Sequence, residues 1–497
     1  MTQFFSNTVN PLLIKELRQF VRNRFIIILL NFYVLAIVVA CMMILVTDAQ
    51  QHTKTIGKDM FFILMLIFFI TGFLSVVLRT AWTTATDRIN EDLMFYSSIK
   101  PSTIVFGKIL SGMVMTFVLM SAVMPFVTLA YTLRGIDLII ILEIMIQIFM
   151  LLQVLNSFAI FVASSNKFKF SAFLSLLIVG GISFWLGFGA QTMIYEILYH
   201  TIHIVDITRV FYFLLYLESV FLVIFISGST VMLSPPTSNR MFPFRVLLTV
   251  IFVISLLVSY SGIFNMPIKH TYKMFIFFSM AIVPFLILAV TCEPDQWSNR
   301  IRRHLPKSLI YRAVLFPFYT GAPCGIIWLF MLAAALFWVN NVFHCDMLFF
   351  HNDLHFLPGV IILTFNYSVT AMLIRSWCFR KLDSIYVLII ILVLLLTFTV
   401  GSMLLHLLLI SSLDFTVNDP FIGYSVSPLS ALNPFCTFEN AGQFKEECIN
   451  GMLIWFGVLI IFLIIWYSQR LIHFNSKIEE PMTCEEARKF IQRLENS

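Results

Sequence analysis

Long apolar runs recur along nearly the whole chain and are separated by shorter polar segments. A helix needs about 20 predominantly apolar residues to cross the hydrocarbon core of a bilayer. The pattern therefore predicts an all-α, polytopic membrane protein with about twelve transmembrane helices. The first six are expected at roughly 25–46, 60–78, 109–133, 138–163, 170–192 and 210–233. The other six are expected at roughly 246–264, 273–291, 324–343, 356–374, 384–412 and 451–468.

Positive charge indicates the orientation of these helices. If the N-terminus lies inside, the inner segments hold most of the 32 lysines and arginines. Cytoplasmic loops of membrane proteins carry such an excess. We therefore expect both termini in the cytoplasm, with a polar cytoplasmic tail at 469–497.

The predicted spans divide into two six-helix halves, 25–233 and 234–468, with similar punctuation. Each half has a long basic inner loop after its second span, at 79–108 and at 292–323. Each half also has its longest outer segment before its last span, at about 191–209 and 413–450. No residue-level identity relates the halves, so a parallel duplication is favoured on organisation alone, and coincidence is the alternative.

Composition agrees with a membrane protein, since 60% of the residues are hydrophobic and only 12% are charged. A soluble domain is closer to half apolar and a quarter charged. The net charge of +6 follows from membrane topology and predicts no nucleic-acid partner. Eight cysteines without a CxxC spacing give no metal or redox motif.

Two polar stretches suit helices lying along a membrane surface. Within 1–24, Asn10 and Pro11 are typical of a helix start, and apolar and basic residues then alternate as on an amphipathic helix. The other reading is that 1–24 only supplies topogenic charge. Within 79–108, the four apolar residues 93–96 lie between charges and predict a short surface helix that Pro101 ends.

Motifs for nucleotide chemistry are absent from the sequence. There is no GxxxxGK[ST], and no HExxH, GxSxG or GxGxxG is found in a suitable context. The chain is therefore expected to be no enzyme and to carry no cofactor. Any energy from ATP has to come from another chain.

Two stretches resemble the permease subunits of type-2 ATP-binding-cassette (ABC) exporters: PLLIKELRQFVRNR before the first span and TDRINEDLMFYSSIKPSTIVFGKIL before the third. In that family an amphipathic connecting helix precedes the first span and a coupling helix follows the second. The resemblance covers about the first 135 residues well. It implies that the residues coupling the chain to an ATPase are Asp87, Arg88, Glu91, Leu93, Pro101, Gly107 and Lys108.

This resemblance also implies partners and a location. A cytoplasmic ABC ATPase would bind the chain, hold the ATP and drive export of a hydrophobic or lipid-linked cargo across the lipid bilayer. The expected location is the plasma membrane, as a multi-pass protein of a bacterial inner membrane. Twelve spans are twice the usual six, so one chain could replace two, and a homodimer is the other possibility.

The second inner loop carries a cluster of basic residues that admits two readings. One is a second docking patch for the ATPase, and the other is a topogenic or lipid-headgroup patch. The central residues of this cluster are Arg300, Arg302 and Arg303. The following Phe-Pro-Phe at 316–318 and the glycine at 321 predict a broken start to the ninth span.

Polar residues within the predicted spans are few. They could line a translocation path, or they could form only interhelical hydrogen bonds. This seam consists of Glu143, Gln147, Gln153, Asn156 and Glu218.

Outer segments offer two further candidates. His351 and His355 could share a helix face and bind zinc, although interfacial hydrogen bonding by a short loop is the favoured explanation. Cys436 and Cys448 could form a disulfide, for which Cys345 could compete.

Two other function classes fit parts of the sequence. A major-facilitator-type secondary transporter also has twelve spans, and Asp87 and Arg88 supply part of its loop motif without its glycine. A polytopic membrane enzyme would need acid–base residues, and those in 413–450 show no paired spacing.

Overall fold

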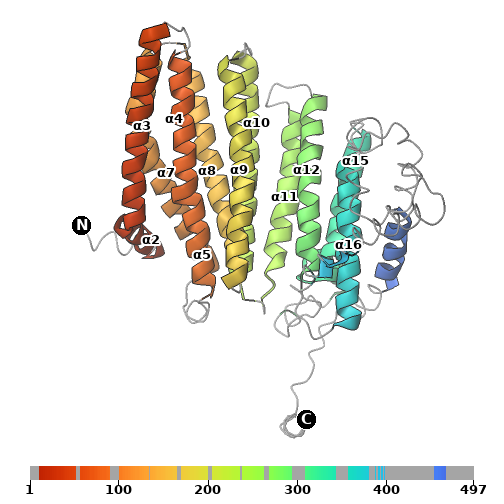
Figure 1. The fold of residues 1–497 in the computed structure, drawn as a ribbon. Helices are drawn as coiled ribbons and strands as arrows, with labels where there is room; N and C mark the ends of the chain where they lie inside the picture. Colours follow the sequence, from red (N-terminus) through yellow and green to blue (C-terminus); the bar gives the residue numbers. More distant parts are fainter. Residues whose placement is uncertain are drawn as a thin grey trace, which may run out of the picture. The chain divides into compact units, whose positions relative to one another are not determined.

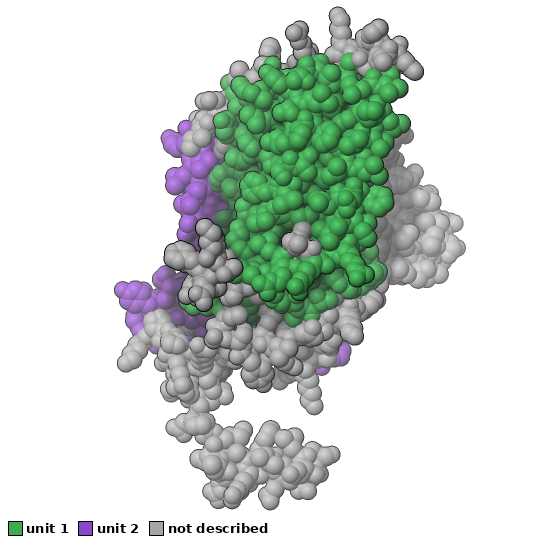
Figure 2. Space-filling view, turned by 90° about the vertical axis from the view of Figure 1, so that its left-hand side faces the viewer, with its two compact units in different colours: residues 1–235, 264–266 green, residues 236–263, 267–497 purple. Residues whose placement is uncertain are grey.

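The protein is described by a computed structural model. The structure describes residues 11–51, 56–89, 100–133, 135–164, 169–199, 204–235, 238–261, 268–293, 301, 308–342, 356–379, 453–465 and seven positions between 387 and 397. Over these residues the chain is almost entirely helical and has no strand. It divides into two compact units, residues 1–235 with 264–266 and residues 236–263 with 267–497 (Figure 2). Each unit is described below by itself.

Unit 1 is a bundle of long helices that stand side by side (Figure 1). The short helix α2 lies at the foot of α3 (Figure 1). The elements are α2 (Pro11–Arg22), α3 (Arg24–Gln51), α4 (Ile56–Gly72), the π-helix η1 (Phe73–Leu78), α5 (Arg79–Ile89), α7 (Pro101–Thr132), α8 (Leu138–Ser164), α9 (Lys169–Tyr199) and α10 (Ile204–Leu233).

The core of unit 1 is built around α4. Met60, Phe61, Leu64 and Phe68 recur at helical spacing and are almost completely buried among α3, α7, α8 and α9. By contrast, large apolar side chains such as Trp185 on α9 remain exposed. Exposed apolar faces over helices of this length are typical of a surface that contacts lipid.

Seven helices of the described residues are long and apolar enough to cross a membrane, and an eighth is added if one bent pair is a single span. The seven are Arg24–Val46, Ile56–Asp87, Pro101–Thr132, Leu138–Ser164, Leu176–Tyr199, Thr208–Leu233 and Met241–Ser261. The prediction of an all-α, multi-pass membrane protein is thereby confirmed. The total of twelve spans and the cytoplasmic location of both termini remain predictions.

The prediction for the end of the second span was wrong. We expected the span to end near 78, but the helix runs on through η1 and α5 to Ile89, and the apolar span extends to Asp87. Small residues on α5 make this extension possible, because Thr84 and Ala85 are buried where α5 packs against α8 and α9. Ala85 meets Ala163 of α8.

The third helix also begins earlier than expected, at Pro101 instead of 109. Proline is favoured at the first position of a helix because its missing N–H would have no partner there. Pro101 therefore starts α7. The predicted surface helix before it lies in 90–99, outside the described residues.

Unit 2 contains α11 (Met241–Ser261), α12 (Ile268–Thr291), α14 (Leu309–Leu315), the 3-10 turn η2 (Phe316–Phe318), α15 (Ala322–Val342) and α16 (Phe356–Cys378). A short apolar helix covers Leu453–Ile465. Of the predicted spans, 384–412 lies mostly outside the described residues.

The predicted broken start of the ninth span is confirmed. Ile310–Phe318 and Ala322–Leu336 are bent by 87° at the break. Gly321 lies at this bend with a φ of 139°, a conformation that residues with a Cβ rarely adopt. The break leaves backbone polar groups that need partners within the protein.

Candidate functional site

The first candidate site lies at the foot of unit 1, where α2 packs against the start of α7. On α2, Leu13 and Glu16 are buried, whereas Lys15 and Arg18 are exposed. The buried face of this amphipathic helix therefore contains a carboxylate. A buried carboxylate needs a compensating charge or hydrogen bonds.

Lys108 of α7 supplies that charge. Lys108 is 3% exposed, and its Nζ lies 3.2 Å from Glu16 Oε1 and 2.6 Å from Asp87 Oδ2. Arg79 of α5 adds an attractive electrostatic interaction with Glu16. We call Glu16, Asp87 and Lys108 the Lys108 junction, because the buried ammonium of Lys108 joins α7 to carboxylates of α2 and α5.

Four of the residues predicted to couple the chain to an ATPase have side chains that the structure describes. Asp87 and Lys108 are in direct contact, Gly107 is buried, and Pro101 is half-buried at the start of α7. Glu91, Leu93 and the side chain of Arg88 lie outside the described residues. The ion pair between Asp87 and Lys108 therefore links the chain before the segment 90–99 to the chain after it.

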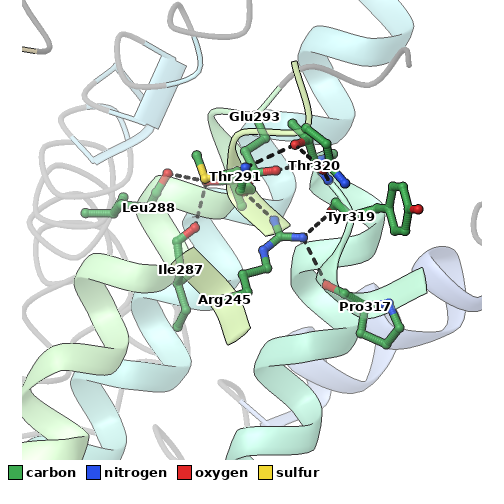
Figure 3. Close-up of polar contacts among 11 residues, drawn as sticks. Arg245, Ile287, Leu288, Thr291, Glu293, Pro317, Tyr319 and Thr320 are labelled. Carbon is green, nitrogen blue, oxygen red and sulfur yellow. Dashed lines mark hydrogen bonds and ion pairs between the residues drawn. The ribbon is translucent and has the colours of Figure 1, made fainter. Parts of the chain in front are cut away.

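A second buried ionic site lies in unit 2 at the broken helix (Figure 3). Arg245, near the start of α11, is 1% exposed and pairs with Glu293, two residues beyond the end of α12. Figure 3 shows the guanidinium reaching from α11 to the break. There it donates to the carbonyl of Pro317 at 3.0 Å and to that of Tyr319.

The carboxylate of Glu293 also binds the backbone on the other side of the bend. Glu293 Oε2 accepts a hydrogen bond from the Gly321 N–H at 2.6 Å. Thr320 adds to the network, because its hydroxyl lies 2.9 Å from Asn239 Oδ1 and 3.2 Å from the Met241 N–H. We call Arg245, Glu293 and the backbone of 317–321 the Arg245 junction. It covers the backbone groups that the break exposes.

The two junctions share a chemical pattern. In each unit a buried cation pairs with a carboxylate at or just after the C-terminal end of a long apolar helix. Asp87 ends the span Ile56–Asp87 in unit 1, and Glu293 follows α12 in unit 2. The cations come from different helices: Lys108 lies on α7, the third span of unit 1, and Arg245 lies on α11, the first helix of unit 2. Sequence reasoning missed both Glu16 and Arg245. Arg245 was explained as a topogenic charge next to a span, and Glu16 as a polar residue of an amphipathic surface helix.

The predicted second docking patch lies outside the described residues, because Arg300, Arg302 and Arg303 are not described. Ile301, between them, is buried with Phe316, Tyr319 and Cys324. The loop 292–323 is therefore anchored beside the Arg245 junction at this point.

The predicted polar seam runs along α8 within unit 1. Gln147 Nε2 donates to Glu218 Oε1 of α10 at 2.6 Å, and Gln153 Nε2 donates to Thr116 Oγ1 of α7 at 2.9 Å. Glu143 bonds Thr208 of α10. These contacts support interhelical hydrogen bonding, the simpler of the two readings.

Hydrogen bonds between helices do not account for the whole seam. Both polar atoms of the fully buried Asn156 lack a partner, and this side chain packs against Gly112, where a Cβ would come within 2.3 Å of its Nδ2. Further buried oxygens without a partner are Glu143 Oε2, Gln147 Oε1, Gln153 Oε1 and Glu218 Oε2. The seam therefore keeps unused hydrogen-bonding capacity, as the translocation-path reading requires.

The remaining candidates are not described. His351, His355, Cys436 and Cys448 lie outside the described residues. Within the described ranges, Cys41, Cys292, Cys324 and Cys378 are free thiols. No group of three or more His, Cys, Asp or Glu side chains in these ranges is placed to hold a metal ion.

Comparison with known proteins gives no functional assignment for this chain. No family model, no curated protein and no solved structure matches this chain.

Proposed function

We propose that this chain is the membrane-spanning subunit of an exporter that a separate ABC ATPase drives by hydrolysing ATP. The observation that carries the proposal is the Lys108 junction. It ties the amphipathic helix α2 to both ends of the segment that the sequence resemblance assigns to ATPase coupling.

The geometry suits transmission of force. An ATPase that pushes on 90–99 acts on α5 and α7, and the 2.6 Å contact between Asp87 and Lys108 fixes these two helices together at that point. The ion pair between Glu16 and Lys108 also links α2 to these two helices. Only the Lys108–Glu16 pair is buried on both sides, whereas the Asp87 carboxylate is partly open to solvent. Because Lys108 holds both carboxylates, the three elements are expected to move as one body.

A major-facilitator-type secondary transporter is the second candidate. The observation in its favour is Glu218, a buried carboxyl within a membrane-spanning helix, where coupled ion transport places ionisable groups. Asp87 argues less for this candidate. It matches the aspartate of the major-facilitator loop motif, but its carboxylate pairs with Lys108 of the next helix, which is not part of that motif.

Photocrosslinking in the native host separates the two candidates. A photoreactive amino acid is placed at Leu93 or at Lys100, which is exposed just before α7. The matched control position is Asp137, exposed beyond the other end of α7. We expect positions 93 and 100, but not 137, to crosslink to a chain that carries a Walker A motif, identified by mass spectrometry. Absence of such a product from both positions would contradict the proposal.

A further inference from the structure

Glu218 occupies an unusual position for a carboxylate. It lies ten residues into the span Thr208–Leu233, about 15 Å from one end and about 22 Å from the other at 1.5 Å per residue. Its side chain is 8% exposed. The carboxyl group is therefore held at the depth of the hydrocarbon core, where an unpaired charge is strongly disfavoured.

The immediate contacts of Glu218 compensate a negative charge poorly. Oε1 accepts one hydrogen bond, from Gln147 Nε2 at 2.6 Å, and Oε2 accepts none. An ionised carboxylate can accept about four hydrogen bonds through its two oxygens. The single donor is a neutral amide, which gives much less stabilisation than a cation.

The charged groups on neighbouring elements do not supply the missing compensation. The carboxyl of Glu143 lies on α8 one turn before Gln147, and a second negative charge there would disfavour ionisation of Glu218. Helix α7 carries two titratable groups. Lys108, near its N-terminal end, is paired with Glu16 and Asp87, and Tyr131 lies near its C-terminal end.

On α10 itself, Arg209 is nine residues before Glu218, roughly 13 Å along the helix axis, and the tyrosines 212 and 216 lie between them. Among the described residues, no lysine or arginine forms an ion pair with Glu218.

We propose that the interface between α8 and α10 is a proton-binding site, in which Glu218 Oε2 carries a proton while the two helices are in contact. The proton removes the buried charge and turns Oε2 into a donor. On the facing helix α8, the polar atoms of Gln147 and Glu143 that have no partner are acceptor oxygens, so α8 offers no further donor to an ionised Glu218 from these two residues.

The proton is exchanged with solvent water. If the Gln147 hydrogen bond is broken and water reaches the carboxyl group, the acid releases its proton to water and becomes a carboxylate. Closure reverses the step. Opening of the seam is thereby linked to pH, whether or not an ATPase drives it.

Infrared spectroscopy of the full-length protein in lipid nanodiscs tests the proposal directly. Glutamate labelled with ¹³C at the side-chain carboxyl separates its protonated carbonyl band from that of aspartate. At neutral pH we expect the wild type to show a protonated glutamate band. Glu218→Gln should lose one carboxyl equivalent of it per chain, and Glu218→Asp should move the signal into the aspartate band.

Glu196→Gln is the matched control, since Glu196 is exposed on α9 outside the seam and its replacement should leave the protonated glutamate band intact. A wild-type spectrum without a protonated glutamate band at neutral pH would overturn the proposal. So would its replacement by a carboxylate band when sodium or potassium is added at constant pH, because the occupant would then be a metal cation. The wild-type and Glu218→Asp spectra decide the outcome even if Glu218→Gln fails to fold.

Discussion

Replacing Lys108 with methionine should destabilise unit 1 by about 3–5 kcal/mol, the range for removing one partner of a buried ion pair. Methionine keeps the volume and the apolar stem but leaves Glu16 buried without its cation. For a unit of this size we expect the apparent Tm in nanodiscs to fall by of order 10 °C. Differential scanning fluorimetry of the purified protein measures the change.

Two variants control for that result. Lys100→Met removes a lysine that is exposed before α7 and should leave the Tm unchanged. Lys108→Met combined with Glu16→Gln should recover much of the loss, because the buried charge is removed with its partner. If Lys108→Met melted like the wild type, Lys108 would not hold α2, α5 and α7 together.

Replacing Arg245 with methionine should destabilise unit 2 by at least about 3–5 kcal/mol, the range for breaking a buried ion pair alone. The change leaves Glu293 buried without a cation and removes the donors to the carbonyls of Pro317 and Tyr319. These orphaned carbonyls, at about 1–3 kcal/mol each, place the expected loss at or above the upper end of that range. Thermal unfolding should show a lower midpoint, and hydrogen exchange should rise first in 316–325.

A double-mutant cycle gives the sharper result. Adding Glu293→Gln to Arg245→Met should recover only part of the stability, since the amide removes the charge but cannot donate to two carbonyls on the far side of the bend. Complete recovery would mean that charge pairing alone matters and that the carbonyl contacts contribute nothing. The exposed Arg24, at the start of α3, provides the control through Arg24→Met.

The sequence predicted the features that depend on local pattern. Apolar runs located the seven described helices that are long and apolar enough to cross a membrane. The Phe-Pro-Phe sequence and Gly321 located the break before α15. Glu218 and Gln147 stood out as polar residues in apolar runs, and the structure brings them into contact.

Features that depend on pairing between distant residues could not be predicted. Glu16 and Lys108 are 92 positions apart, and nothing in the sequence links them. Arg245 had a sufficient local explanation as a topogenic charge. The continuation of the second helix through Thr84 and Ala85 was missed because a polar, small-residue stretch is also typical of a loop. Its helical form depends on α8 and α9, which pack against it.

The most direct test of the central claim is the membrane side of residue 100, since an ATPase can reach the coupling segment only from the cytoplasm. In a chain whose eight native cysteines are replaced, Lys100→Cys and Asp137→Cys are exposed to a membrane-impermeant maleimide on intact cells. We predict that Asp137→Cys is labelled and that Lys100→Cys reacts only after the membrane is opened. Labelling of Lys100→Cys from outside would contradict the account.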